Sequence, residues 1–118
     1  MSAMALGWAG DIPAGAMRVY DAGERRILVA HIGDQFYALD AKCPHMGGDL
    51  SRGRLEGTAL TCPVHGSRFD VRDGRVIAWV DKLPGILKGA VTAIKKPTPA
   101  TTYPLHVLDN NLSVSLPV

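Results

Sequence analysis

The sequence predicts an all-β fold, a sandwich or a barrel, and three observations support this prediction. The apolar stretches are short, turn residues separate them at close spacing, and the 118 residues include 13 glycines and 8 prolines. Many short strands joined by such turns are typical of sandwiches and barrels. A chain of 118 residues and 12.6 kDa has room for one domain, which we expect to span residues 1–118.

The strand candidates follow one another along the chain as hairpins. They are residues 17–20, 27–32, 35–39, 58–61, 68–71, 75–78, 103–108 and 112–116. The turn signals between them are Gly33-Asp34, Asp73-Gly74 and Asp109-Asn110-Asn111, which are residue types that tight hairpin turns favour.

One segment, residues 83–97, departs from the strand pattern. Leu87, Val91 and Ile94 recur at helical spacing, and Pro84 is a residue that can begin a helix. A glycine and two β-branched residues inside the segment favour the alternative, an irregular surface loop with a few buried anchors. The sequence leaves both interpretations open.

The composition excludes several classes of protein. Apolar residues make up 47% and charged residues 20%, which is ordinary for a globular chain and excludes a disordered tail. A net charge of +2 argues against a nucleic-acid partner, since such proteins usually have a clear basic excess. No stretch reaches the roughly eighteen apolar residues of a membrane helix, and residues 1–10 make a poor export signal because no Lys or Arg precedes Arg18. We therefore expect a cytoplasmic protein without a membrane partner.

Two short motifs each combine a thiol with an imidazole. They are Cys43-Pro44-His45 and Cys62-Pro63-Val64-His65, with sixteen residues between them, and they contain both cysteines and two of the four histidines. Glycines follow each motif, which lets the backbone approach a bound group and point its N–H groups at an anionic sulfur. The pattern indicates a metal centre.

Two cysteines and two histidines can bind either zinc or an iron–sulfur cluster. Zinc-finger ligands usually come as like pairs, whereas here each motif supplies one Cys and one His. This favours a two-iron cluster with both Cys on one iron and both His on the other. Zinc remains the alternative, because ligand type alone does not fix the metal. His31 and His106 lie in strand-like runs and are expected to be structural or surface residues.

The spacing Cys-x-His, sixteen residues, Cys-x-x-His resembles that of the Rieske [2Fe–2S] proteins. The resemblance extends to Trp8 with residues 11–15, to residues 37–40 and 50–53, to Phe69-Asp70, to Asp73-Gly74 and to residues 103–105. It leaves out residues 83–100, which form an extra segment. The resemblance implies a Rieske-type antiparallel β-sandwich with a small cluster-binding subdomain of two loops, at about residues 41–70.

By the same resemblance, Cys43 and Cys62 bind the inner iron of one [2Fe–2S] cluster, and His45 and His65 bind the outer iron. The neighbours expected to line the cluster are Met46, Gly47, Val64, Gly66 and Ser67. We expect no catalytic residue, because no nucleophile–base pair and no mononuclear-iron motif accompanies these ligands.

Two features indicate which type of Rieske protein this is. Respiratory members join their loops by a disulfide, and the matching positions here are Gly48 and Val64, so the resemblance is to the soluble ferredoxin type. Ser67 is shared with the respiratory type, whereas Phe69 stands where that type has a hydroxyl-bearing Tyr. Hydroxyl donors raise the potential, so we expect a value in the lower half of the family range of roughly −150 to +300 mV.

The resemblance implies a one-electron carrier and not an enzyme, passing electrons from a flavin-dependent reductase to a terminal oxygenase in a dioxygenase system. One alternative is a small Rieske subunit of a larger oxidoreductase, such as a nitrite-reductase-like enzyme, docked through residues 83–97. A less favoured alternative is a zinc-binding interaction module.

Overall fold

The computed structural model describes residues 2–44, 48–64, 66–79, 84–94 and 96–117, which form three antiparallel sheets and one α-helix. The molecule is elongated, with extents of 50 × 30 × 19 Å. Its elements are β1 (Ser2–Trp8), β2 (Met17–Ala22), β3 (Arg25–Ile32), β4 (Gln35–Asp40), β5 (Arg54–Glu56), β6 (Ala59–Thr61), β7 (Arg68–Asp70), β8 (Val76–Ala78), α1 (Gly85–Ile94), β9 (Thr102–Tyr103), β10 (Leu105–Leu108) and β11 (Asn111–Leu116). Two short 3-10 turns, Ala9–Asp11 and Leu50–Arg52, complete them.

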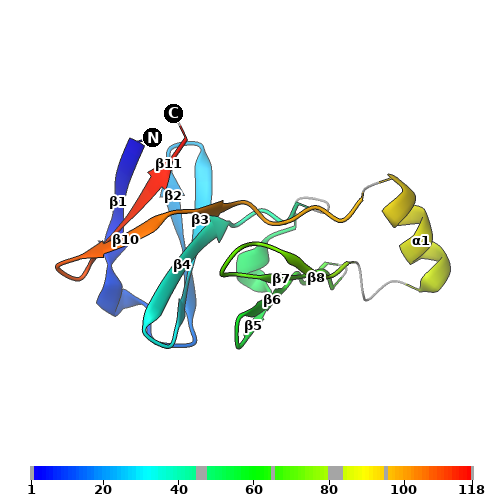
Figure 1. Cartoon of the computed structure of the whole chain (residues 1–118), viewed down its shortest axis with the longest axis horizontal. Coiled ribbons are helices and arrows are strands. Elements are labelled where there is room, and N and C mark those ends of the chain that lie inside the picture. Colours follow the sequence, from blue (N-terminus) through cyan, green and yellow to red (C-terminus); the bar gives the residue numbers. More distant parts are fainter. Residues whose placement is uncertain (1, 45–47, 65, 80–83, 95, 118) are drawn as a thin grey trace.

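Two of the sheets form a sandwich that holds both chain ends (Figure 1). The outer sheet has the order β1-β11-β10, and the middle sheet has the order β2-β3-β4-β9. The turn between β10 and β11 places Asp109 and Asn110 at φ 51° and 64°. These left-handed angles suit the tight hairpin turn that the Asp-Asn sequence predicts. The predicted antiparallel β-sandwich is confirmed.

Strand β3 is buried on both faces and divides the interior into two cores. Ile27 and Val29 face the sandwich core, which includes Leu112 and Val114 of the outer sheet. Leu28 and Ala30 alternate with them and belong to a second core, which also contains both cysteines. We call this second core the thiol-side core. The continuous apolar run at residues 27–30 is thus explained by a strand covered on both sides.

The third sheet, with the order β5-β6-β7-β8, lies beyond the middle sheet and is called the loop-bearing sheet. Its strands are three residues long. Two loops are attached to it: the first loop, residues 41–49, and the second loop, residues 62–67. Phe69 and Trp79 pack edge to face in the thiol-side core, with ring centroids 6.3 Å apart.

Residues 85–94 form the helix α1, so the helical interpretation of this segment is correct and the irregular-loop alternative is wrong. The backbone N–H of Lys88 donates to the carbonyl of Pro84 at 2.8 Å, so the helix begins where the proline predicts. Val91 packs against the thiol-side core, whereas Ile86 is 89% exposed. Figure 1 shows α1 beyond the loop-bearing sheet, at the opposite end from the termini.

The structure has two strands that the sequence analysis did not predict, β1 and β5, and it divides one predicted strand in two. β1 pairs with β11, which lies near the other end of the sequence. The Ala, Gly and Met residues of β1 have weak strand propensity, so the local pattern did not indicate it. β5 is too short to be recognised from pattern. The predicted strand at residues 103–108 breaks at Pro104, which lacks an N–H donor, into β9 and β10 on different sheets. No helix in the described part of the chain is long and apolar enough to cross a membrane.

Candidate metal centre

The first loop leaves the end of β4 and is closed by backbone hydrogen bonds. Lys42 and Asp49 form an isolated antiparallel bridge across its base. Inside this bridge, the N–H of Cys43 donates to the carbonyl of Gly48 at 2.7 Å. The loop therefore returns on itself directly after the first Cys-His motif.

The second loop connects β6 to β7 and repeats the same closure. The N–H of Cys62 donates to the carbonyl of Ser67 at 2.7 Å, again five residues along the chain. A further bond, from the N–H of Gly66 to the carbonyl of Cys62, measures 3.1 Å. Gly66 has φ 78°, a left-handed angle that glycine adopts without steric cost. Each cysteine is thus held at the start of a loop of the same form.

The two thiols are buried in the thiol-side core, with residue exposures of 1% for Cys43 and 0% for Cys62. Neither cysteine is in a disulfide. Burial keeps water from the two sulfurs and places them among apolar side chains. Both sulfurs are therefore shielded from solvent and available as soft ligands to a buried metal centre.

Gly48 brings the first loop against the second. A Cβ atom at this position would lie 2.8 Å from Cγ2 of Val64 and 3.0 Å from Sγ of Cys62. A Cβ at 2.8 Å would force the Val64 side chain to shift, so the close contact between the loops favours glycine at position 48. The same Cβ would lie 3.6 Å from Cβ of Val64, which is within the range that a disulfide needs. The predicted correspondence of positions 48 and 64 is therefore geometrically sound, with a Gly–Val contact in place of the disulfide.

Several predicted site residues lie outside the described residues: His45, Met46, Gly47 and His65. The other predicted residues, Cys43, Cys62, Val64, Gly66 and Ser67, all lie in the two loops that meet at Gly48. Within the described ranges, no group of three or more His, Cys, Asp or Glu side chains could hold a metal ion. The predicted donors His45 and His65 lie outside those ranges.

Two residues beside Cys62 bear on the electronic properties of the site. Ser67 is fully buried at the end of the second loop, and its backbone carbonyl accepts from the N–H of Cys62. Phe69 is fully buried two residues later and brings no hydroxyl. A tyrosine at position 69 would add one hydroxyl donor, which phenylalanine lacks.

Asp70 fixes the chain immediately after the second loop. Its buried carboxylate accepts hydrogen bonds from the backbone N–H of Arg72 at 2.9 Å and from the Arg72 guanidinium at 3.0 and 2.8 Å. Arg75 lies 3.3 Å away. These contacts lower the pKa of Asp70 to about 2, with the Arg72 side-chain hydrogen bond as the largest cause. The sequence resemblance included Asp70 but gave it no role, which the structure identifies as anchoring the β7–β8 turn.

Asp49 does the same for the first loop, and the sequence analysis missed it. Its carboxylate accepts from the backbone N–H of Ser51 at 3.0 Å and from the Ser51 hydroxyl at 2.6 Å, which caps the Leu50–Arg52 turn. The hydroxyl bond is the largest cause that lowers the pKa of Asp49. The signal that could have revealed it is Asp-x-Ser at the start of a turn.

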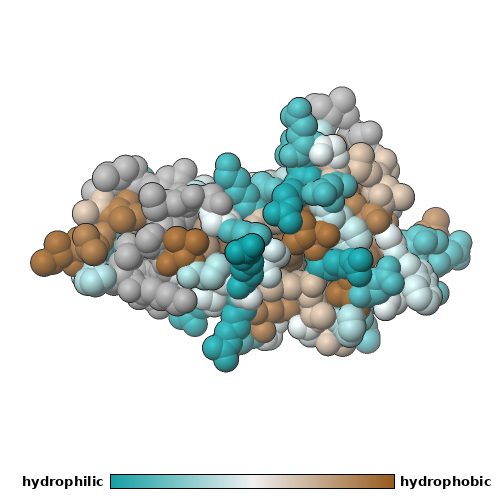
Figure 2. All heavy atoms as spheres, turned by 180° about the vertical axis from the view of Figure 1, so that it is seen from behind, coloured by the Kyte–Doolittle hydropathy of each residue, from teal (hydrophilic) through white to brown (hydrophobic). Residues whose placement is uncertain are grey.

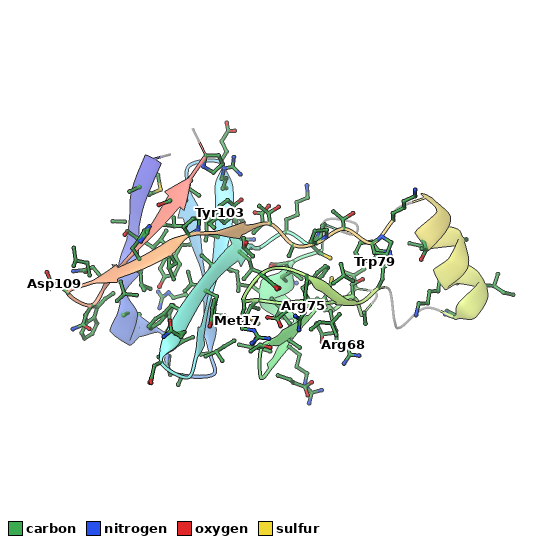
Figure 3. All side chains as sticks on the ribbon, viewed as in Figure 1. Met17, Arg68, Arg75, Trp79, Tyr103 and Asp109 are labelled. Carbon is green, nitrogen blue, oxygen red and sulfur yellow. The ribbon has the colours of Figure 1, made fainter. Side chains whose placement is uncertain are left out.

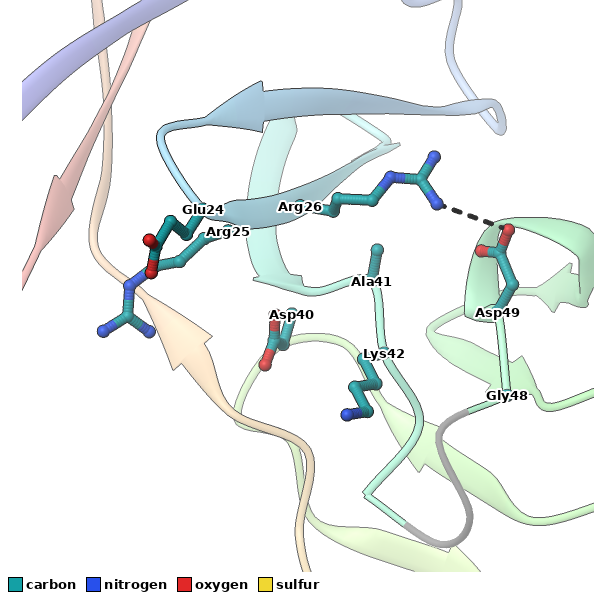
Figure 4. A pocket seen from close by; sticks show the side chains of 8 residues that line it. All are labelled: Glu24, Arg25, Arg26, Asp40, Ala41, Lys42, Gly48 and Asp49. Carbon is teal, nitrogen blue, oxygen red and sulfur yellow. Dashed lines mark ion pairs between the residues drawn. The ribbon is translucent and has the colours of Figure 1, made fainter.

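A groove of 410 Å³ borders the first loop (Figure 4). Its lining residues are Glu24, Arg25, Arg26, Asp40, Ala41, Lys42, Gly48 and Asp49. Arg26 reaches across it to within 3.7 Å of Asp49. Burial raises the pKa of Asp40, while Arg25 and Lys42 oppose that rise. The described lining of the groove thus contains three acidic and three basic residues, and the Arg26–Asp49 ion pair links the middle sheet to the first loop.

The comparison with protein families decides the identity of this centre. A model of the Rieske [2Fe–2S] domain matches residues 2–103 of the chain. The chain belongs to the Rieske family. The assignment implies one Rieske cluster, and two buried thiols on matching loops fit such a centre. The zinc-binding interaction module is excluded.

Individual relatives and structures show which Rieske proteins this chain resembles. The 3-phenylpropionate/cinnamic acid dioxygenase ferredoxin subunit of Escherichia coli (strain K12) is 30% identical over 108 residues, covering 91% of this chain and 87% of the relative. The ferredoxin component of biphenyl 2,3-dioxygenase from Rhodococcus jostii (strain RHA1) is 36% identical over 69 residues, 58% of this chain and 64% of that protein. The Sphingomonas yanoikuyae B1 ferredoxin shares the fold, with a TM-score of 0.79 at 20% identity, over 98% of this chain and all of that one.

These findings confirm the predicted type of protein. The chain is a Rieske ferredoxin, an electron carrier rather than a catalyst, related to the ferredoxin subunits of dioxygenases. The predicted cofactor, one Rieske [2Fe–2S] cluster, is confirmed by the family assignment.

Proposed function

We propose that this Rieske ferredoxin carries electrons one at a time from a flavin-dependent reductase to the terminal oxygenase of a ring-hydroxylating dioxygenase system. The observation that carries the proposal is the 30% identity, over 91% of this chain, to a dioxygenase ferredoxin subunit. A solved complex of oxygenase and ferredoxin in carbazole 1,9a-dioxygenase adds support, since its match has a TM-score of 0.76 at 25% identity, over 96% of this chain and 92% of that chain.

We propose the ligand set that the sequence indicates. Cys43 and Cys62 hold the inner iron, and His45 and His65 hold the outer iron. Met46, Gly47, Val64, Gly66 and Ser67 line the group. When bound, the cluster supplies reversible one-electron chemistry. The chain's own part is to bury the thiols, to exclude water around them and to hold the loops together at Gly48.

We propose the cytoplasm as the compartment, and the similarity to dioxygenase ferredoxin subunits supports this. We also propose that residues 1–118 make a single Rieske domain, with the cluster-binding region at about residues 41–70. The extra segment at residues 83–100 contains α1.

The first test is electron paramagnetic resonance of the dithionite-reduced protein, with iron and acid-labile sulfide counted on the same sample. We expect a rhombic signal with the low average g value of mixed His and thiolate ligation, two irons and two sulfides. Replacing His45 or His65 should abolish that signal. An unchanged signal in either variant would contradict the ligand set.

The second test concerns the direction of electron flow. The holoprotein is mixed with the flavoprotein reductase and the terminal oxygenase purified from the same cells, and product formation is followed as its concentration is varied. We expect turnover to depend on the ferredoxin and to saturate. A ferredoxin that the reductase reduces but that no oxygenase reoxidises would support the alternative, a subunit of another oxidoreductase.

A further inference from the structure

The charges of the chain are divided unequally between the two ends of the molecule. Residues 41–99 contain ten Lys and Arg and five Asp and Glu, a net charge of +5. The remaining residues, 1–40 and 100–118, contain three basic and six acidic residues, a net charge of −3. The positive part holds the two loops, the loop-bearing sheet and α1, and the negative part is the sandwich. The overall net charge of +2 is the sum of these two unequal contributions.

Arginines concentrate in a groove beside the second loop. The groove measures 450 Å³, and its lining includes Arg52, Arg54 and Arg68 together with Pro63 and Gly66 of that loop. Figure 3 places Arg68 on the loop-bearing sheet, between the sandwich and α1.

The groove has a cationic excess in spite of its ion pairs. Among the described residues of its lining, Glu56 is the one acid, and it pairs with Arg54 at 3.1 Å; Arg52 lies 3.8 Å from Asp49. Both arginine side chains are at least 80% exposed, so these pairs are weak and a partner's carboxylate can exchange with them at little cost.

The helix α1 adds an apolar surface to this positive end. Ile86 is 89% exposed and Leu87 is 52% exposed, and hydrophobic atoms form the tip of the molecule there in Figure 2. Residues 82–108 contain four lysines and no Asp or Glu. Val91 packs against the thiol-side core, and Figure 1 shows α1 at the same end of the molecule as the loop-bearing sheet.

We propose that the loop-bearing end is a docking surface for redox partners that present carboxylates around an apolar patch. Arg52, Arg54 and Arg68 pair with the carboxylates, and Ile86 and Leu87 supply the apolar anchor. A dipolar molecule 50 Å long turns its positive end toward an acidic partner before contact, which raises the association rate. The proposal rests on the proposed function, and it names the chemistry of the partner at that site.

The test measures binding of the oxidised holoprotein by isothermal titration calorimetry. One probe is a flavodoxin chosen for its net negative charge, and the other is cytochrome c, which is positively charged. We expect the flavodoxin to bind more tightly, and its affinity to fall about tenfold or more between roughly 20 and 200 mM salt. Sedimentation of the ferredoxin alone at the same concentrations should show a monomer.

Matched variants locate the surface. Arg54→Glu should weaken flavodoxin binding about fivefold or more, whereas Arg18→Glu on β2, with the same change of charge, should change it less than about twofold. Ile86→Ser should weaken binding about threefold, whereas Leu108→Ser, which alters a 74% exposed residue at the far end, should leave it unchanged.

Three results would overturn the proposal: tighter binding of cytochrome c, equal effects of the two arginine variants, or a ferredoxin dimer that buries this end. Equal effects of the two serine variants would remove α1 from the surface. The readout is binding between oxidised proteins, so it does not depend on turnover. Failure here with intact reductase-to-oxygenase transfer would reject the docking surface alone.

Discussion

The sandwich and the loop-bearing sheet differ in strand length and in the composition of their cores. In the sandwich, β2, β3, β4 and β11 have six to eight residues each, the β2–β3–β4 pairings run without a register shift, and the core consists of aliphatic and aromatic side chains. In the loop-bearing sheet the strands have three residues, and each loop is closed by a few backbone bonds. The core beneath this sheet includes two thiols.

This difference implies that the two regions owe their stability to different interactions. Long ladders and buried aliphatic side chains stabilise the sandwich without help. Three-residue strands bury little by themselves, so the loop-bearing sheet needs its bound group for part of its stability. Metal binding and local folding are then coupled more strongly in this region than in the sandwich. Each prediction below tests that contrast.

The largest effect is expected from removal of one thiol. Cys62→Ser should abolish iron and acid-labile sulfide, and hydrogen exchange should show lost protection in β5 to β8 with retained protection in β2 to β4. The reason is that the second loop and its cysteine are built into the loop-bearing sheet, whereas β2 to β4 are also held by the sandwich core on their other face. Equal loss of protection in both regions would show that the whole molecule depends on the cluster.

The next largest effect is expected at Gly48. Gly48→Ala would place a Cβ 2.8 Å from Val64 and 3.0 Å from the Cys62 sulfur, and it should lower the free energy of unfolding by about 1–3 kcal/mol. Val64→Ala in the same chain should restore part of that loss, because it removes the closest atom. Gly89→Ala in α1 is the control: nothing lies within 4 Å, so it should be neutral or stabilising by up to about 1 kcal/mol. Denaturant unfolding measures all three.

A smaller effect is expected at Asp70. Its pKa of about 2 lies below the usual 3.8, so its ion pairs stabilise the fold fully above about pH 4, and this contribution is lost as the pH falls toward 2. Asp70→Asn should therefore cost about 1–2 kcal/mol at pH 7, measured by denaturant unfolding. The difference from the native protein should shrink below pH 4. Asp34→Asn, in an exposed turn, is the control and should change stability little.

The smallest effect is expected in the reduction potential. The buried Ser67 hydroxyl should favour the reduced, more negative cluster by about 1 kcal/mol, so Ser67→Ala should lower the potential by roughly 40 mV. Phe69→Tyr should raise it, provided that the added hydroxyl reaches a sulfur. Spectroelectrochemistry measures both, and the unaltered protein should lie in the lower half of the family range. Absence of any shift on removing the Ser67 hydroxyl would show that it points elsewhere.

The sequence predicts the local features of this fold better than its long-range contacts. The hairpin turns at Gly33 and Asp109 were predictable because their residue types dictate backbone angles. β1 was not predictable, because its partner β11 lies at the other end of the chain and supplies the pairing energy. The helix α1 was undecided, since helical spacing and poor helix formers pointed in opposite directions.

The same distinction holds at the site. The ligand motifs could be predicted because the chemistry needs particular residue types at short spacings. The contact of Gly48 with Val64 and Cys62 joins two loops that are distant in sequence, and only the resemblance to respiratory proteins pointed to it. The anchoring role of Asp70 needed side-chain geometry, whereas the role of Asp49 was missed although Asp-x-Ser at the start of a turn could have indicated it.

The two-faced burial of β3 also sets a condition on the turn that follows it. Ile27 and Val29 fill one core while Leu28 and Ala30 fill the other, so sliding the strand by a single residue would exchange the two sets. The two-residue turn at Gly33 and Asp34 fixes the pairing of Ile32 with Gln35 and prevents that exchange. An insertion in this turn would misplace the aliphatic floor beneath the thiols, although the turn itself bears no ligand. The length of this surface hairpin thus determines which β3 side chains pack beneath the iron–sulfur site.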